Sequence, residues 1–272
     1  MVFVNPMPDE VLLEEYNSGY FDNAHGGLQT HPLTVAFHSA INLLRVLYVE
    51  RFIEKEKISV HRVLEIGPGG GHFARQWMKR NPQTSQYTGV ESDKSCHTKL
   101  ISSNVDVFLS MDEVPADREF DLVVISHVLE HTSNPGDFIK NCTRLLKQSG
   151  ILFIEVPCKD FEHKKLDEPH LLFFDKGPME LFLSGLGFNS IETSYYGKTI
   201  SDLRKPISFI NKCKEKMRNQ LLSRGILFPY SGFEKGLEEM NDPLERACVK
   251  PFKAHIEQKE PSWWLRAICI KK

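Results

Sequence analysis

The sequence predicts an α/β protein whose sheet is mostly parallel and carries helices on both faces. Three observations support this class. Segments with strand character alternate with segments of helical periodicity between residues 59 and 197. Residues 122–125 and 151–154 are unbroken apolar runs, as expected for strands buried on both faces. A glycine-rich turn follows the first strand of the series, as in nucleoside-binding α/β sheets.

The N-terminal part of the chain is expected to be an arm followed by one helix. Residues 1–33 are rich in glycine and proline and predict irregular structure. A helix is expected after Thr34 as its N-cap and to end near Lys57, with Leu43, Leu47 and Phe52 on one face. We treat residues 1–58 as one unit.

Seven strands and four core helices are expected in the rest of the chain. Proline at the first turn begins the third of these helices, and Gly150 ends it. The expected strands are residues 62–66, 87–91, 105–109, 120–126, 151–156, 190–196 and 264–270. The expected helices are residues 71–79, 94–102, 135–149 and 178–186.

The last two strands are separated by a long connection. About 65 residues lie between them, which is far beyond an ordinary loop. We therefore divide the chain after residue 58 into a core at 59–197, a helical insertion at 198–262 and a final, antiparallel core strand at 263–272. An amphipathic helix in the insertion, with Ile207, Ile210, Cys213, Met217 and Leu221 on one side, is expected to pack over the ligand edge of the sheet.

Composition excludes several classes of protein. The net charge is −2, so no overall attraction to nucleic acid is expected. The N-terminus lacks the basic and apolar regions of a secretory signal, and we expect no membrane span, because no apolar run approaches ~20 residues. The six cysteines form no CxxC pair, so we expect reduced thiols and a cytoplasmic protein.

Residues 63–71 are the most informative segment. They end a strand and continue into a turn with Gly67, Gly69 and Gly71, and Glu91 ends the next strand. Glycine allows the backbone to turn tightly and to approach a ligand, and the carboxylate can accept hydrogen bonds from both ribose hydroxyls. The turn therefore predicts a nucleoside site. A dinucleotide fingerprint would place a third glycine at position 72, where this chain has His72, so an NAD(P)-binding oxidoreductase is the disfavoured alternative.

At this point the sequence resembles the class I S-adenosylmethionine-dependent methyltransferases. Residues 65–71, 89–91, 120–124 and 145–152 resemble four motifs of that family, in the family's order. The resemblance implies a Rossmann-like fold and S-adenosylmethionine as cofactor. It implies that the three glycines line the methionine part of the cofactor, that Glu91 takes the ribose diol and that Met111 packs on the adenine. The full set of cofactor residues that we expect is Glu65, Gly67, Gly69, Gly71, Glu91, Ser92, Met111 and Ser126.

A histidine-rich segment follows the fourth strand. In a helical turn His127, Glu130 and His131 would share one face, and His170 comes after the fifth strand. The segment resembles the metal site of certain O-methyltransferases, which have ExxEH here. His127 replaces the first glutamate, which would shift preference from Mg²⁺ towards Zn²⁺ or Fe²⁺. Three interpretations stay open: a divalent metal held by these four residues, a metal-free site with His127, His131 or His170 as general base, and a purely structural role.

The chemistry favours an oxygen acceptor. An amine needs only to be neutral, whereas an alcohol is a weak nucleophile that gains from an imidazole base or a metal. We therefore expect O-methylation of a hydroxyl on a small molecule or sugar, of the kind methylated by the glycan and small-molecule subgroup of the family. N- or C-methylation, and a non-catalytic module that binds the cofactor, are the alternatives.

Two further segments bear on the substrate. The resemblance implies that the N-terminal segment folds over the cofactor, which makes Tyr16, Tyr20 and His25 candidates for substrate contact, with an ordinary packed arm as the alternative. Residues 204–224 hold seven basic side chains and a single acid, Glu215. This run either attracts a phosphorylated substrate or is a solvated helix face. It has few aromatic residues, so binding of single-stranded nucleic acid is disfavoured.

Overall fold

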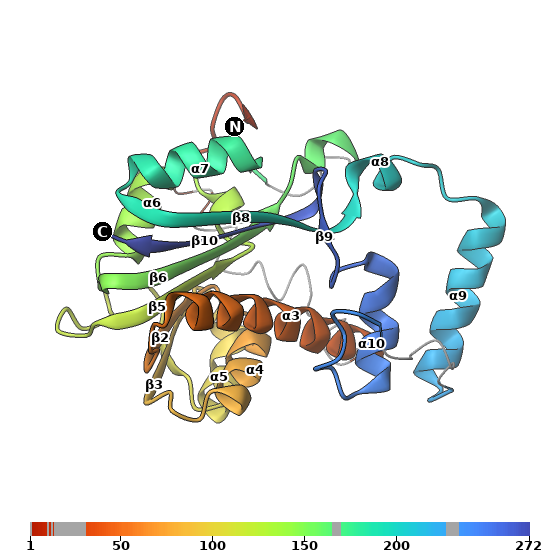
Figure 1. Cartoon of the computed structure of the whole chain (residues 1–272), viewed down its shortest axis with the longest axis horizontal. Coiled ribbons are helices and arrows are strands. Elements are labelled where there is room, and N and C mark those ends of the chain that lie inside the picture. The colour runs from red at the N-terminus through yellow and green to blue at the C-terminus, as the bar shows by residue number, and fades with distance from the viewer. Residues whose placement is uncertain (1, 10, 12, 14–30, 165–169, 227–233) are drawn as a thin grey trace.

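The centre of the protein is one eight-stranded mixed sheet between two layers of helices (Figure 1). The computed structural model describes residues 2–9, 11, 13, 31–164, 170–226 and 234–272. The strand order is β4-β3-β2-β5-β6-β10-β8-β9. The strands are β2 (Arg62–Ile66), β3 (Gln86–Val90), β4 (Asp106–Phe108), β5 (Phe120–Ser126), β6 (Leu146–Pro157), β8 (Phe188–Thr199), β9 (Glu257–Gln258) and β10 (Ser262–Lys271).

The first five strands of the sheet are parallel, and the C-terminal strand is inserted against their direction. Strands β2 to β6 pair in parallel, whereas β10 runs antiparallel to both of its neighbours, β6 and β8. The predicted α/β class is confirmed. The number of strands differs from the expected seven, because β9 adds a second antiparallel strand at the edge, paired with β8. Two polar residues, Glu257 and Gln258, make up β9, which is too short to leave an apolar pattern in the sequence.

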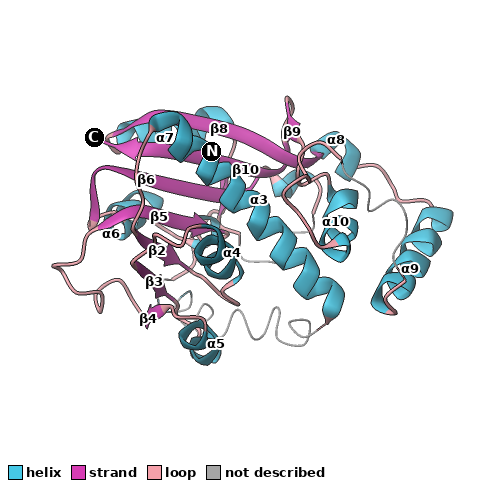
Figure 2. Cartoon of the chain, turned by 60° about the horizontal axis from the view of Figure 1, so that its bottom comes forward, coloured by secondary structure: helices cyan, strands magenta, loops and turns pink. Residues whose placement is uncertain are grey.

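Helices cover both faces of the sheet, as predicted. Figure 2 shows α3, α4 and α5 on one side of the strands. The helices are α3 (Pro32–Glu56), α4 (His72–Arg80), α5 (His97–Ser102), α6 (Pro135–Cys142), α7 (Lys176–Gly185), α8 (Ile200–Leu203), α9 (Phe209–Ser223) and α10 (Pro243–Val249). Single 3-10 turns are η2 (Lys94–Cys96), η3 (Leu129–His131), η4 (Asp160–Glu162) and η6 (Lys250–Phe252). A separate antiparallel pair joins β1 (Val2–Phe3) to β7 (Leu172–Phe173).

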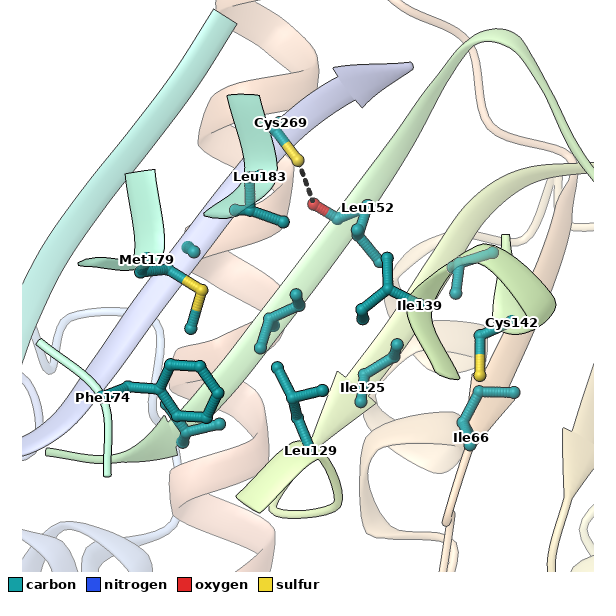
Figure 3. Close-up of a cluster of buried hydrophobic side chains, with 14 of the residues drawn as sticks. Ile66, Ile125, Leu129, Ile139, Cys142, Leu152, Phe174, Met179, Leu183 and Cys269 are labelled. Atoms are coloured by element: carbon teal, nitrogen blue, oxygen red, sulfur yellow. Dashed lines mark hydrogen bonds between the residues drawn. The ribbon is translucent and has the colours of Figure 1, made fainter. Parts of the chain in front are cut away.

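Each face of the sheet has its own apolar core. Side chains of α6 and α7 pack on one face, where Ile139, Met179 and Leu183 meet Ile125 and Leu152 of the strands (Figure 3). Side chains of α3 and α4 pack on the other face, with Phe73 and Trp77 among the largest fully buried groups. This two-sided burial explains why β5 and the end of β6 read as unbroken apolar runs.

Helix α3 begins earlier than predicted and is more apolar than the sequence reading allowed for. It starts at Pro32, which occupies the first turn, where a missing N–H costs nothing. By length and hydropathy α3 could cross a membrane, contrary to the expectation that no segment could. Its most apolar window is 56% buried against the rest of the protein. Burial on the sheet, with Ala40, Val46 and Val49 fully enclosed, accounts for that apolar composition.

The predicted helix at residues 135–149 is wrong in its second half. Helix α6 ends at Cys142, and β6 already begins at Leu146, which pairs with Phe120 of β5. Leu145 and Leu146 fit a helical face by spacing, but the same residues complete the sheet instead. Tertiary pairing outweighed local periodicity here, as it often does near element ends.

The region between β8 and β10 is partly helical, but its longest helix does not cover the sheet. Helix α9 stands at the edge of the molecule beside α10 (Figure 1). The apolar residues that were expected to face the ligand edge are instead exposed on α9, as in Ile210 at 64% and Met217 at 58%. The expectation that this amphipathic helix packs over the ligand edge is therefore wrong.

Candidate active site

A large cleft opens at the carboxyl ends of β2, β3 and β5, where α/β sheets bind their ligands. Its volume is about 1250 Å³, which exceeds the ~300–1,000 Å³ of pockets that hold one drug-sized ligand. The cleft can therefore hold a cofactor and an acceptor together. Its walls come from α3 and α4, from the loops after β2, β3 and β5, and from residues around η6 and β10.

The glycine turn forms one wall and requires its glycines. Gly67, Gly69 and Gly71 all have positive φ, at 68°, 49° and 68°. A Cβ at Gly67 would lie 2.5 Å from Val128 Cγ2, and one at Gly71 would lie 2.9 Å from Leu100 Cδ2. At Gly67 and Gly71 a side chain would therefore meet both a strained backbone and these neighbours. Gly67 and Gly69 line the cleft, whereas Gly71 is buried at the start of α4 and does not line it. The turn then passes directly into α4, so its backbone faces the cleft at the start of a helix.

Glu91 directly follows β3 and holds the glycine turn in place. One carboxylate oxygen, Oε2, accepts a hydrogen bond from the Gly69 backbone N–H at 2.8 Å, and Oε1 accepts one from Asp93 at 2.9 Å. Burial raises the pKa of Glu91. Each carboxylate oxygen has a second lone pair, so Glu91 can still accept hydrogen bonds from a diol in the cleft. The predicted ribose acceptor thus lies against the predicted methionine wall.

The other predicted cofactor residues also line the cleft. Glu65 is 4% exposed and accepts a hydrogen bond from Tyr87 at 2.6 Å, and burial raises its pKa to about 7. Met111 is 6% exposed, and Ser92 lies beside Glu91 on the cleft wall. The Ser126 hydroxyl is buried without a hydrogen-bond partner among the described residues, which is unusual unless a ligand supplies one. This orphaned group and the glycine cradle both fit a bound nucleoside cofactor.

Three of the predicted polar residues meet in the same cleft. Glu130, His131 and His170 each offer one ligand atom, and these atoms lie within 4.8 Å of one another. The His131 and His170 rings are 4.9 Å apart in an edge-to-face arrangement. All three residues are buried, and Oε1 of Glu130 also lies 3.3 Å from His127 Nδ1, while its Oε2 has no hydrogen-bond partner among the described residues. The Leu171 N–H donates a hydrogen bond to the Glu130 carbonyl at 2.7 Å, which holds His170 beside the turn that follows β5.

Asp160, which sequence reasoning missed, orients His170. Its carboxylate forms a short hydrogen bond with His170 Nδ1, and Asp160 is 1% exposed. Burial by itself would raise the pKa of Asp160, but the contact with His170 outweighs burial and the pKa is lowered. An ionised Asp160 keeps the proton of His170 on Nδ1 and leaves Nε2 as the nitrogen that can accept a proton or bind a metal.

His127 does not share a helical face with Glu130 and His131. Its backbone is left-handed, with φ 56°, and only residues 129–131 form a 3-10 turn. Its Nε2 lies 3.2 Å from Glu155 and its Nδ1 3.3 Å from Glu130. Burial alone would lower the pKa of His127, but the two carboxylates outweigh burial and raise it. His127 stands outside the group formed by Glu130, His131 and His170.

A buried charge network lies beneath His127. Glu155 is fully buried in β6 and accepts hydrogen bonds from Arg45 at 2.8 Å and from Arg266 at 2.6 Å. The Arg266 guanidinium also lies 4.2 Å from the centre of the Tyr196 ring. Burial by itself would raise the pKa of Glu155, but the two arginines hold it well below its usual value. Among 34 basic and 36 acidic side chains, no pattern in the sequence distinguished these.

Aromatic rings form another wall of the cleft. Phe252 lies 4.9 Å from Phe37 and 5.5 Å from Trp263, which stacks on Trp264 at 5.3 Å. Both tryptophans line the cleft, although Trp264 is only 5% exposed. The predicted substrate residues Tyr16, Tyr20 and His25 lie outside the described residues.

Comparisons with known proteins identify the family of the chain. A family model described as a methyltransferase domain matches residues 40–187, more than half of the chain. The ubiquinone biosynthesis O-methyltransferase of Coxiella burnetii is 28% identical over 130 residues, covering 45% of this chain and 53% of that protein. The enzyme of the same name from Xanthomonas oryzae is 31% identical over 121 residues, covering 42% and 49%. The chain thus matches about half the length of these relatives.

Solved structures show the same fold. The plantazolicin methyltransferase BpumL, solved with S-adenosylhomocysteine, aligns with a TM-score of 0.54 at 15% identity and covers 96% of this chain and 97% of its own. A methyltransferase from Thermotoga maritima, suggested to be a histamine N-methyltransferase, has a TM-score of 0.54 at 15% identity, covering 93% and 99%.

Fold, cleft and glycine turn together are those of the Rossmann-like class I methyltransferases. Within that class the chain belongs to the methyltransferase-domain family whose model covers residues 40–187. The alternative of an NAD(P)-binding oxidoreductase is thereby set aside.

Proposed function

We propose that this enzyme methylates a hydroxyl group of a small molecule or sugar and that His170 is the general base. The observation that carries the proposal is the buried pair of Asp160 and His170, of which His170 lines the same cleft as the glycine turn. A hydroxyl is a weak nucleophile, so an imidazole that removes its proton during transfer accelerates the reaction. An amine would need no such base.

Each polar residue then has a distinct task. S-adenosylmethionine supplies an activated methyl group when it is bound. Asp160 holds the His170 ring so that Nε2 can accept the acceptor's proton, and it stabilises the imidazolium that results. His131, packed against His170, is placed to hydrogen-bond the same acceptor. Glu130 and Glu155 raise the pKa of His127, which stabilises its protonated form and makes it less suited than His170 to act as the base.

The aromatic wall supports a flat or apolar acceptor face. Rings from α3, η6 and β10 line the cleft together and offer a continuous surface for packing. Such a surface suits a phenolic ring and the apolar face of a sugar equally. The alternatives of N- and C-methylation would use His170 differently, since a neutral amine needs no general base.

The test compares acceptors of one skeleton that carry a hydroxyl or an amine, such as a phenol and the matching aniline, with release of S-adenosylhomocysteine as the readout. We expect turnover of the hydroxyl compound, and a loss of about 10²–10⁴-fold in kcat for His170→Ala, the usual contribution of a general base. Asp160→Asn should also lower kcat, because Asp160 orients His170. Methylation of the amine alone, with full activity in His170→Ala, would assign the enzyme to N-methylation.

A divalent metal is the second candidate, and a specific observation favours it. Glu130, His131 and His170 present one oxygen and two nitrogens within 4.8 Å, and the buried Oε2 of Glu130 lacks a hydrogen-bond partner among the described residues. Asp160 behind His170 matches the outer carboxylate that commonly orients a metal-bound histidine. These residues fit an ion such as Zn²⁺, Fe²⁺ or Mg²⁺, which would lower the pKa of a bound hydroxyl.

Elemental analysis of the purified protein distinguishes the two candidates. A stoichiometric divalent ion that is lost in His131→Ala would support the metal. Glu180→Gln on α7 is a suitable control, because that side chain lies outside the cleft lining. Full turnover by metal-free protein in the presence of a chelator would reject the metal and leave His170 as the base.

A further inference from the structure

One exposed helix, α9, has features that the methyltransferase activity does not use. It contributes no residue to the cleft lining. Its side chains Phe209, Ile210 and Met217 are 80%, 64% and 58% exposed. Ile207, just before the helix, and Ile226, just after it, are 55% and 50% exposed. A contiguous group of large exposed apolar side chains is typical of an interaction site.

The apolar residues of α9 form one stripe that faces away from the protein. Successive helical residues turn by about 100°, so Phe209, Cys213, Met217 and Ile210 fall within about 100° of one another. The opposite side holds α9 to the body. There Leu222 is 2% exposed, and Arg218 donates a hydrogen bond to the Ala247 carbonyl at 3.2 Å. The stripe is therefore an outward surface and not a displaced part of the core.

Lysines border this stripe on both sides. By the same helical geometry Lys212 and Lys216 lie along one edge of the stripe, and Lys214 lies along the other. None of the three has an ion-pair partner in the described part of the chain, whereas nearby Lys205 pairs with Asp202. The one acid of the helix, Glu215, lies beyond Lys212 and Lys216 as seen from the stripe, and these three residues line a shallow groove beside the start of α3. The surface thus combines exposed apolar groups with uncompensated positive charge.

We propose that α9 docks this enzyme on an anionic lipid surface. An apolar stripe flanked by lysines is the arrangement of helices that lie in the plane of a membrane interface. The apolar residues would enter the boundary between headgroups and acyl chains, while the lysine ammonium groups would reach the anionic headgroups. The net charge of the whole chain is −2, so this attraction is local to α9 and does not come from the whole protein.

The charge decides between possible occupants of the stripe. A second copy of the chain would bring its own α9 lysines against these lysines, which is repulsive in a symmetric contact. An anionic lipid surface instead satisfies both the apolar stripe and its basic borders. Docking would also place the cleft near acceptors that partition into membranes, although the docking itself does not depend on which atom is methylated.

The experiment is flotation of the full-length protein with vesicles of phosphatidylcholine alone or with about one third phosphatidylglycerol. We expect binding to the anionic vesicles only, weakened by salt. Replacing both Lys212 and Lys216 by Gln should weaken it about 25-fold, at roughly fivefold per lysine. Phe209→Glu should weaken it at least about 10-fold, since it removes an inserted ring and adds a negative charge.

Leu181→Glu on α7 is the matched control, because Leu181 is 77% exposed on a helix face without this stripe. It should bind vesicles as the wild type does. All variants should keep their affinity for S-adenosylhomocysteine, since none alters the cleft. Three results would overturn the proposal: absence of vesicle binding, equal binding to neutral vesicles, or an α9 variant that binds as well as Leu181→Glu. Dimerisation that Phe209→Glu abolishes, without vesicle binding, would assign the stripe to a second copy.

Discussion

Replacing Glu155 by Gln should destabilise the protein more than almost any other isosteric change. Glu155 is 0% exposed, and it balances Arg45 at 2.5 Å and Arg266 at 2.6 Å. Glutamine keeps the size and one acceptor oxygen but removes the charge, so two buried guanidinium groups lose their counter-ion. Removal of one partner from a buried ion pair typically costs about 3–5 kcal/mol. Total stabilities are only about 5–15 kcal/mol, so this loss is large.

The change also predicts a difference in pH dependence. The pKa of Glu155 is well below its ordinary value in the folded protein. A carboxyl with a lowered pKa contributes stability that is present above its unfolded pKa of about 4.3 and is lost as the pH falls through the folded value. The wild type should therefore lose stability on acidification more steeply than Glu155→Gln. The pKa of His127 should fall in the variant, because one of its two carboxylates becomes neutral.

Urea unfolding followed by tryptophan fluorescence measures the free energy, and histidine NMR titration measures the pKa. Asp106→Asn is the control, since the ion pair of Asp106 with Arg118 lies at the surface and its loss should cost less than about 1 kcal/mol. The prediction is refuted if, at neutral pH, the unfolding free energy of Glu155→Gln is within about 1 kcal/mol of the wild-type value. The network would then not be a tightly coupled buried unit.

Three further predictions concern the glycine turn and its carboxylates. Burial raises the pKa of Glu65 to about 7, so the stability that its protonated form contributes below pH ~4.5 is lost as the pH rises. In urea unfolding, the stability of Glu65→Gln relative to wild type should therefore increase by about 2.5 kcal/mol between pH 5 and pH 8. A difference that stays the same across this range would contradict the prediction. Gly67→Ala should lower the free energy of unfolding by about 1–2 kcal/mol because of its positive φ alone. The contact with Val128 should lower it further, and adding Val128→Ala should restore only that second part. Restoration of the whole loss would show that backbone strain is absent. Glu91→Gln leaves the Gly69 or the Asp93 N–H without an acceptor, so calorimetry should show at least about 10-fold weaker binding of S-adenosylhomocysteine, and equal affinity would remove Glu91 from the site.

Elements buried on both faces were the most predictable part of the fold. Strand β5 was predicted at its observed bounds, because its unbroken apolar run has few other uses in a chain of this kind. Helix α6 was overextended because Leu145 and Leu146 suit a helix and a strand equally well by local spacing. Strand β9 was missed because pairing with β8, and no pattern of its own, makes it a strand.

The site divides in the same way. The glycine turn and Glu91 are neighbours through a βαβ connection, so their spacing in the sequence determined both their contact and the class of cofactor. Glu155 and Arg266 carry no motif, and only the folded sheet brings them to His127, whereas Asp160 lies ten residues before His170 but also carries no motif that marks the pairing. The local features of the backbone could thus be predicted from the sequence alone. The buried charges that tune the histidines were decided by tertiary structure, because burial and proximity, which set a pKa, exist only after folding.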